Sequence, residues 1–393
     1  MKSSGFRFYN PVKLISGDKA LDNLSYELNQ LQSRQPLILT DPGVANVGVI
    51  ELVKKALIGS DQFTISVYSR VPPDSSPAVV NEVAGFFREN ECDSIIAVGG
   101  GSVLDTGKAV NIVISEGVDD IMQLEGSKLR KPMKPFIAVP TTAGTGSEVT
   151  YAAMIRDSHQ HVKVLFASYQ LFPDVAILDP RMTRSLPPLV TAATAMDAMS
   201  HAMEAYISNQ KNPFSDAYGF TAIKLIRENL LRVIEDGDDL QGRFYLANAA
   251  CMAGAAFSNS GVGLVHALGH ALGGVCGVPH GVAVNIFLPH GLEYNMSAVK
   301  DTIGEMLLPL EGPEVYAQTP KDKRAEKTVE RIREFKDELY KLTKLSRTLR
   351  EAAVKKDSLE EVAQKTMKDA ALHFNPAKIT HDDALALLEK AYQ

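Results

Sequence analysis

The sequence predicts two unlike halves, an α/β domain with a Rossmann-like parallel sheet followed by an all-α domain. From residue 7 to about residue 180, short β-branched or apolar runs alternate with amphipathic stretches, which is the rhythm of strand–helix–strand units. Beyond about residue 185, strand signals cease and Ala-, Leu- and Met-rich helical segments continue to the end. The length of 393 residues also suits two domains. We expect the domains to span 1–183 and 184–393.

Apolar runs and helix breakers divide both halves into individual elements. We expect strands at 36–40, 63–68, 94–98, 135–139 and 162–167, and helices at 47–57, 77–91 and 102–114. Such an alternation implies a mainly parallel sheet that binds ligands at the carboxyl ends of its strands. Between 321 and 350, apolar residues recur with the period of a surface helix that docks by one stripe. The stripe consists of Val329, Ile332, Phe335, Leu339, Leu342, Leu345 and Leu349.

Composition and charge narrow the class of protein. A net charge of −6, without a marked Lys/Arg block, argues against nucleic acid as the main partner. No apolar run approaches the roughly 18 residues that span a bilayer, and the N-terminus has no signal-peptide pattern. The cysteines Cys92, Cys251 and Cys276 are odd in number and lack a CxxC spacing, which fits unpaired thiols in a reducing compartment. We expect a cytoplasmic enzyme with no membrane partner.

A run of metal-type ligands lies in the second half of the chain. Asp197 and His201 are four residues apart in a stretch without Gly or Pro, so on a helix their side chains share one face. His266 and His270 repeat that spacing. His280 follows the break Gly-Val-Pro, which allows the chain to turn a third imidazole back towards the first two.

The setting of these histidines favours metal binding over a structural role. A single histidine is more often a satisfied core or surface residue than a ligand. The stretch 262–290, however, holds four of the nine histidines among mostly Gly, Ala, Val and Leu, where unsatisfied imidazoles would be costly. One carboxylate with three imidazoles suits iron(II), zinc or another late first-row ion. Magnesium and calcium prefer oxygen ligands.

The pattern Asp-x-x-x-His, His-x-x-x-His and Pro-His-Gly resembles the iron-containing (group III) alcohol dehydrogenases, from about residue 8 to the C-terminus. The resemblance implies a dehydroquinate synthase-like architecture, NAD and Fe²⁺ as cofactors, and a homodimer or higher homo-oligomer. It places the metal ligands at Asp197, His201, His266 and His280, and a catalytic histidine beside the nicotinamide at His270. Glycerol dehydrogenases and dehydroquinate synthases resemble this layout with a carboxylate and two histidines only.

Three glycines follow the strand expected at 94–98: Gly99, Gly100 and Gly101. They precede a helix opened by Ser102, where backbone N–H groups and the helix dipole favour a phosphate. A tight strand–helix connection would use glycine without any ligand. The run GGGSVLDTGK resembles the family's pyrophosphate signature, with Asp105 and Lys108 at its acidic and basic positions.

Other candidate cofactor residues lie at strand ends. Asp41 ends the strand at 36–40, where a carboxylate would bind ribose hydroxyls and oppose a 2′-phosphate, so NAD is expected. Asp-Pro-Gly is also a favourable turn sequence. The hydroxyl-rich loop 140–150 resembles the family's cofactor loop, and Lys163 falls where the family places a lysine near the nicotinamide ribose. The candidates in that loop are Thr141, Thr142, Thr145 and Ser147.

These observations favour an NAD-dependent dehydrogenase that interconverts small primary alcohols and aldehydes. Bound metal should lower the pKa of the alcohol, and the nicotinamide should accept the hydride. The apolar residues Phe257, Val262, Leu264, Ala267 and Leu268 surround His266 in the sequence and favour an uncharged substrate. A polyol dehydrogenase on the same scaffold remains an alternative. A metallohydrolase, with Glu204 as the base, is a second alternative.

Overall fold

The computed structural model describes residues 5–57, 62–157 and 162–393. It contains two compact units, one formed by Asn10–Leu186 and the other by Pro187–Gln393 together with Met1–Tyr9. The N-terminal segment joins the C-terminal unit because Tyr9 donates its N–H to Asn259 Oδ1 (2.7 Å) and Phe8 stacks on Phe214 (5.3 Å between ring centroids). Residues 5–9 therefore belong to the same unit as Pro187–Gln393, whereas the sequence-based boundaries place them in the α/β domain.

A six-stranded sheet forms the centre of the unit Asn10–Leu186. Its strands lie in the order β1-β8-β5-β4-β2-β3, and every neighbouring pair is parallel. The strands are β1 (Lys13–Ser16), β2 (Pro36–Leu39), β3 (Ser66–Tyr68), β4 (Ser94–Gly99), β5 (Phe136–Pro140) and β8 (Val175–Leu178). The predicted Rossmann-like parallel sheet is confirmed.

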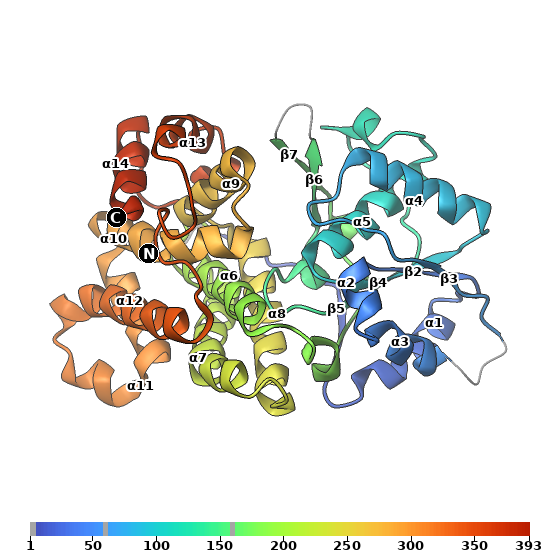
Figure 1. Cartoon of the computed structure of the whole chain (residues 1–393), viewed down its shortest axis with the longest axis horizontal. Coiled ribbons are helices and arrows are strands. Elements are labelled where there is room, and N and C mark those ends of the chain that lie inside the picture. The colour runs from blue at the N-terminus through green and yellow to red at the C-terminus, as the bar shows by residue number, and fades with distance from the viewer. Residues whose placement is uncertain (1–4, 58–61, 158–161) are drawn as a thin grey trace. The chain divides into compact units, whose positions relative to one another are not determined.

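Alternate residues of the strands point to opposite faces, and each face is covered by helices (Figure 1). Leu39 and Ile95 pack with α4 (Pro77–Glu89) and α5 (Gly101–Glu116). Ile38 and Ile96 pack on the other face with α1 (Leu24–Gln30) and α3 (Val49–Leu57). Strands β2, β4, β5 and β8 are buried on both faces, which explains why their sequences are mostly apolar rather than alternating.

Several elements of this unit differ from the sequence-based expectation, and strands β1 and β8 of the main sheet were not predicted. A short helix, α2 (Pro42–Asn46), precedes α3 because Asp41 caps it through Val44 N–H (2.9 Å). The strand predicted at 162–167 exists as β7 (Val162–Ala167), but it pairs antiparallel with β6 (Ala152–Asp157) in a separate two-stranded sheet. The chain thus leaves the main sheet between β5 and β8.

The described part of the second unit is helical, as predicted. Its helices are α6 (Pro188–Ile207), α7 (Pro213–Glu235), α8 (Leu240–Ser260), α9 (Leu264–Cys276), α10 (His280–Glu305), α11 (Leu307–Gln318), α12 (Arg324–Thr343), α13 (Leu359–Thr366) and α14 (His381–Tyr392). Helices α6, α7 and α8 pack against one another, and α10 packs on α6, α9 and α12 (Figure 1). None of the helices in the described residues is both long enough and apolar enough to cross a bilayer.

The helix predicted between 321 and 350 is shorter than its apolar pattern. The first four stripe residues, from Val329 to Leu339, are buried on α12, whereas Leu342 is 46% exposed. Helix α12 ends at Thr343, and Lys344 adopts a left-handed conformation (φ 63°). Leu345 and Leu349 are buried beyond the helix end. The prediction of one continuous stripe is therefore wrong for its last three residues.

Candidate active site

Helix α6 supplies the first pair of candidate ligands from a buried position. The 20-residue helix is rich in Ala and Met, and Pro188 begins it at a position that needs no N–H partner. Asp197 and His201 are one turn apart on the same face, and each is at most 5% exposed. His201 Nε2 lies 3.7 Å from Asp197 Oδ1. The helix is buried almost along its whole length, so these polar side chains are surrounded by protein.

A sharp turn between α9 and α10 brings His280 to the same place. Gly277 ends α9 in a left-handed conformation (φ 69°), and His280 is the first residue of α10. The next residue, Gly281, lies close to α6: a Cβ there would be 2.5 Å from the carbonyl oxygen of Ala193. Glycine therefore allows α10 to begin against α6 and explains the Pro-His-Gly sequence physically.

Three imidazole nitrogens converge on Asp197 Oδ1. The Nε2 atoms of His280, His266 and His201 lie 3.3, 3.6 and 3.7 Å from it. Metal–ligand bonds of about 2.0–2.2 Å place tetrahedral donors about 3.4 Å apart, so these three distances suit one ion, and the ligand atoms of Asp197, His201 and His266 all lie within 4.8 Å of one another. Asp197 Oδ1 and His266 Nε2 are buried and have no hydrogen-bond partner among the described residues. A divalent cation would satisfy both atoms, and the residues therefore fit a metal ion.

Ring packing orients His201. Its imidazole is stacked between the rings of Phe257 (centroids 4.3 Å apart) and His266 (4.4 Å). Its Nδ1 atom is buried without a hydrogen-bond partner in the described structure. Ring stacking, and not a hydrogen bond from Nδ1, therefore orients this imidazole. Phe257 was expected near the substrate, and it lies against a candidate ligand. Of the other expected apolar residues, Val262 is partly buried, whereas Leu264, Ala267 and Leu268 are buried in the core.

Burial determines the charge of the candidate ligands. It lowers the pKa of His201 to about 3, despite the neighbouring carboxylate, and it also lowers the pKa of His280. Both imidazoles are therefore neutral at neutral pH and have lone pairs available. Burial also disfavours a charge on His266, but its contacts with the carboxylates of Asp197 and Glu204 outweigh it and raise its pKa to about 9. The surroundings of His266 thus favour a positive charge at that ring.

Glu204 is a site residue whose role the sequence did not reveal. Its carboxylate accepts Val265 N–H on Oε1 (2.6 Å), and its Oε2 accepts His266 N–H (3.3 Å) and lies 2.6 Å from His266 Nδ1. It is 2% exposed. Both oxygens are therefore engaged, which removes the free base that a metallohydrolase would need. Glu204 follows His201 by three residues on the same helix, and this spacing is the sequence signal that could have predicted its position beside the metal cluster.

His270 lies beside the cluster rather than within it. Its ring stacks on His280 (5.2 Å, 16° between planes) and meets His266 nearly edge-on (5.9 Å, 69°). Its Nδ1 atom is 2.9 Å from Oδ2 of Asp369. No local sequence pattern indicates this second partner, because the two residues are 99 positions apart.

The candidate cofactor loops lie in the unit with the sheet, and close packing explains their glycines. A Cβ at Gly101 would lie 2.7 Å from Thr145 Cγ2, and one at Gly100 would lie 3.2 Å from Thr142 Cγ2. The turn after β4 and the loop after β5 are therefore in contact. Thr141 N–H donates to Gly99 O (3.0 Å), which extends the pairing of β4 and β5 into the loops. The N-terminus of the 16-residue helix α5 begins at this junction.

A buried lysine joins the same two segments. The ammonium of Lys108, which is 1% exposed, donates to the carbonyls of Ser147 (2.7 Å), Thr150 (2.8 Å) and Ala152 (2.9 Å). Asp105 accepts Ser147 O–H (2.5 Å) and Met154 N–H (3.0 Å). Asp105 and Lys108 therefore hold the shape of the hydroxyl-rich loop. The Ser147 hydroxyl is used in this network, so a cofactor contact by Ser147 remains only a prediction.

The other expected cofactor residues have separate surroundings. Asp41 uses Oδ1 to cap α2, so it is a turn residue whatever else it binds. Ser102 Oγ accepts the N–H of Asp74 (3.2 Å), which places the loop before α4 against the glycine turn. Lys163 lies opposite Arg156 in the β6–β7 pair, but its side chain is outside the described part of the structure.

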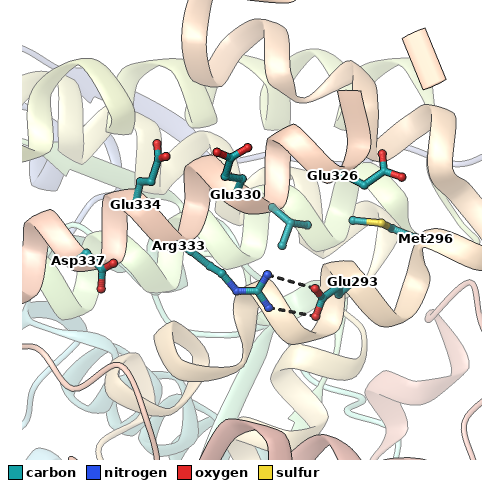
Figure 2. Close-up of a pocket in the computed structure, with 8 residues that line it drawn as sticks. Glu293, Met296, Glu326, Glu330, Arg333, Glu334 and Asp337 are labelled. Atoms are coloured by element: carbon teal, nitrogen blue, oxygen red, sulfur yellow. Dashed lines mark hydrogen bonds and ion pairs between the residues drawn. The ribbon is translucent and has the colours of Figure 1, made fainter. Parts of the chain in front are cut away.

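A groove of about 290 Å³ lies on α10 and α12 and shares no residue with the metal cluster (Figure 2). Figure 2 shows Arg333 binding Glu293 through both carboxylate oxygens, at 3.1 and 3.0 Å. Other acidic residues of the groove are also paired, as Glu326 is with Lys300 (2.7 Å). Surface ion pairs therefore account for its charges, and it is not the candidate active site.

A glycine turn and a hydroxyl-rich loop at the carboxyl edge of a parallel sheet, with a carboxylate–imidazole cluster in a helical unit, define a metal-dependent dehydrogenase. Family comparison agrees: residues 11–180 match the model for iron-containing alcohol dehydrogenase, and residues 191–392 match the C-terminal model of the same family. The chain belongs to the iron-containing alcohol dehydrogenase family and is an oxidoreductase.

Relatives align over almost the whole chain. Alcohol dehydrogenase 4 of Saccharomyces cerevisiae is 34% identical and covers 100% of both sequences. The NAD-dependent methanol dehydrogenase of Bacillus methanolicus is 31% identical over 98% of this chain and 99% of its own. Among solved structures, a 1,3-propanediol oxidoreductase superposes with a TM-score of 0.94 at 32% identity, covering 99% of this chain and 100% of that one. These likenesses support the predicted dehydroquinate synthase-like architecture.

Proposed function

We propose that this protein is an NAD-dependent alcohol dehydrogenase in which Asp197, His201, His266 and His280 hold one Fe²⁺ ion. The observation that carries this proposal is the convergence of three imidazole Nε2 atoms on a buried carboxylate oxygen, within 3.3–3.7 Å. The mixed nitrogen and oxygen donors suit iron(II) or zinc better than magnesium or calcium. The family to which the chain belongs favours iron.

Each turnover converts one alcohol and one NAD⁺ into one aldehyde, one NADH and one proton. The ion, held by the four proposed ligands, would polarise the alcohol oxygen, and NAD⁺ would accept the hydride with its two electrons from the carbinol carbon. The chain supplies the path for the proton: Nε2 of His270 takes up the proton from the O–H group. The stacking of His270 on His280 keeps that ring next to the proposed ligands.

We assign NAD to the glycine turn and the loop after β5. The start of α5 at the glycine turn supports this assignment, because the N–H groups and dipole of a helix N-terminus favour a pyrophosphate. Asp41 at the end of β2 supports NAD over NADP. The name of the Bacillus methanolicus relative, a NAD-dependent enzyme, points the same way.

The substrate is a small, largely apolar primary alcohol. Phe257 against His201 supports an uncharged substrate, and no Lys or Arg occurs between Ala247 and His290 to pair with an acid or phosphate. A buried, unpaired charge on the substrate would cost several kcal/mol. A diol substrate is the second candidate, because the similar solved structure is a 1,3-propanediol oxidoreductase.

One anaerobic experiment tests metal and substrate together. The apoprotein is reconstituted with Fe²⁺, Zn²⁺, Co²⁺ or Ni²⁺, and NADH formation is followed with ethanol, butanol, hexanol, 1,3-propanediol and glycerol. Each buried CH₂ contributes about 0.8 kcal/mol, so kcat/KM should rise about fourfold per carbon until the pocket is full. A preference for 1,3-propanediol or glycerol over butanol would overturn the apolar assignment. The absence of metal-dependent turnover would overturn the metal centre.

We further propose that the enzyme is a cytoplasmic homodimer or higher homo-oligomer. Cys92, Cys251 and Cys276 form no disulfide in the described structure, which supports a reducing compartment. The oligomer is expected from the family. Light scattering coupled to size exclusion measures the mass directly, and a mass of 42.7 kDa, that of one chain, would contradict it.

A further inference from the structure

A partly buried contact holds the proposed proton acceptor. His270 lies on α9, and Asp369 is the residue that precedes a 3-10 turn (Ala370–His373). Oδ2 of Asp369 lies 2.9 Å from Nδ1 of His270. The two side chains are 28% and 20% exposed. This contact ties the C-terminal segment to the histidine beside the proposed metal ligands.

The two oxygens of Asp369 have different partners. Oδ1 accepts the N–H of Ala371 (2.8 Å) and so caps the 3-10 turn. Oδ2 faces His270 Nδ1, and a carboxylate can only accept a hydrogen bond. The proton of a neutral His270 ring must therefore lie on Nδ1, which leaves the lone pair on Nε2. That tautomer is the one that can take a proton from an alcohol through Nε2.

We propose that Asp369 is a positioning residue for alcohol oxidation: it keeps the His270 ring in the Nδ1–H tautomer and in its stacked orientation on His280. This inference rests on the proposed function of His270 as proton acceptor. Asp369 does not touch the reacting atoms and acts only through the histidine. The structural alternative is that the pair merely anchors the C-terminal segment to α9.

The variant Asp369→Asn separates the two roles. The amide oxygen can still accept the Ala371 N–H and cap the turn, because that acceptor is retained. The amide nitrogen, in contrast, is a donor facing Nδ1, and it favours the tautomer with its proton on Nε2. The site then keeps its packing but lacks the lone pair. Asp120→Asn is a matched control, because Asp120 caps another 3-10 turn through Met122 N–H (3.1 Å) and contacts no histidine in the described structure.

The experiment uses the full-length, metal-loaded enzyme and measures kcat, KM for the alcohol, the Kd for NADH and the metal content. We expect Asp369→Asn to lower kcat about a hundredfold or more, the usual contribution of a general base, while KM, NADH affinity and metal content stay near wild type. Asp120→Asn should retain wild-type values of all four quantities. A wild-type kcat for Asp369→Asn, with His270→Ala impaired, would overturn the inference and leave the proposed function intact.

The same substitution in a His270→Ala background tests whether Asp369 acts through the histidine. We expect no further loss of kcat in the double variant, since the group that Asp369 positions is absent. An additional loss of similar size in the double variant would show an anchoring role and overturn the inference. If His270→Ala alone retains wild-type kcat, the role of His270 in the proposed function fails, and the inference falls with it.

Discussion

Glu204 Oε2 lies 2.6 Å from Nδ1 of His266, while Oε1 of the same carboxylate accepts the N–H of Val265 at 2.6 Å. One side chain of α6 thus caps the N-terminus of α9 and orients the imidazole that α9 carries. A carboxylate at Nδ1 keeps a ring proton there, so Nε2, which faces Asp197, is the nitrogen that could give up its proton to bind a metal ion. The two helices that carry the proposed ligands are therefore coupled through this contact.

The first prediction follows from that contact. Glu204→Gln should keep the acceptor for Val265 N–H but present an amide donor to Nδ1, which favours a proton on Nε2 in place of a metal ion. We expect the affinity for Fe²⁺ or Zn²⁺ to fall about 10- to 100-fold, as is usual for such partners of metal-bound histidines. Competition titration against a chelator measures this affinity without any assay of activity.

A control for Glu204→Gln is available on the neighbouring helix. Glu228→Gln on α7 changes an exposed carboxylate that pairs only loosely with Lys224 (3.8 Å). Its metal affinity should equal that of the wild type. Wild-type affinity in Glu204→Gln as well would mean that the carboxylate serves α9 alone and that His266 needs no partner.

The second prediction concerns the proposed ligands themselves. His280→Ala or His266→Ala should abolish turnover and metal retention but leave the Kd for NAD nearly unchanged, because the glycine turn and the metal cluster belong to different units. Metal analysis measures the retention of metal, and NADH fluorescence titration separately measures the affinity for the cofactor. A variant that keeps both its metal and most of its activity would show that the ligand assignment is wrong.

The third prediction concerns the choice of dinucleotide. Asp41→Asn retains the cap of α2 on Val44 N–H but removes the negative charge, and Asp41→Gly removes both. Loss of the charge should raise the NADP/NAD ratio of kcat/KM at least about tenfold in either variant, or about 1.4 kcal/mol. An unchanged ratio, accompanied by lower thermal stability of Asp41→Gly, would identify Asp41 as a turn residue only.

The fourth prediction is a pH dependence of stability at Lys336, far along the sequence from the proposed site. Burial, with a smaller effect from the Arg333 charge, lowers the pKa of Lys336 to about 7 from 10.5. Between about pH 7 and pH 10.5, Lys336 is therefore protonated in the unfolded chain but not in the folded chain. The free energy by which Lys336 destabilises the folded state consequently decreases as the pH rises through this range. Below pH 7 the full cost of a buried charge remains.

Replacement of that lysine should make the pH dependence visible. The midpoint temperature of Lys336→Met relative to wild type should be highest near pH 6 and should decline steadily towards pH 10. Scanning calorimetry at several pH values measures the difference. Lys341→Met, on the exposed surface of the same helix, should show a difference that does not vary with pH. A constant difference for Lys336→Met would show that the buried amine keeps an ordinary pKa.

Local patterns in the sequence were sufficient for most of the architecture. The strand at 94–98 could be predicted because a parallel strand covered on both faces is a continuous apolar run, and β4 occupies Ser94–Gly99. Asp197 and His201 could be paired because a helix repeats every 3.6 residues, and their convergence needs nothing beyond α6. The end of α12 was missed because an apolar period continues through Leu345 and Leu349 after Lys344 has already turned the chain.

Tertiary structure alone decided which residues surround the proposed ligands. The sequence by itself determined the ligand types, the glycine turn and the two unlike halves, since each is a short-range pattern of spacing and composition. The bonds of Glu204 to His266 and of Asp369 to His270 join positions 62 and 99 residues apart. No periodicity connects such positions, because their contact depends on how whole helices pack against one another and bury the groups.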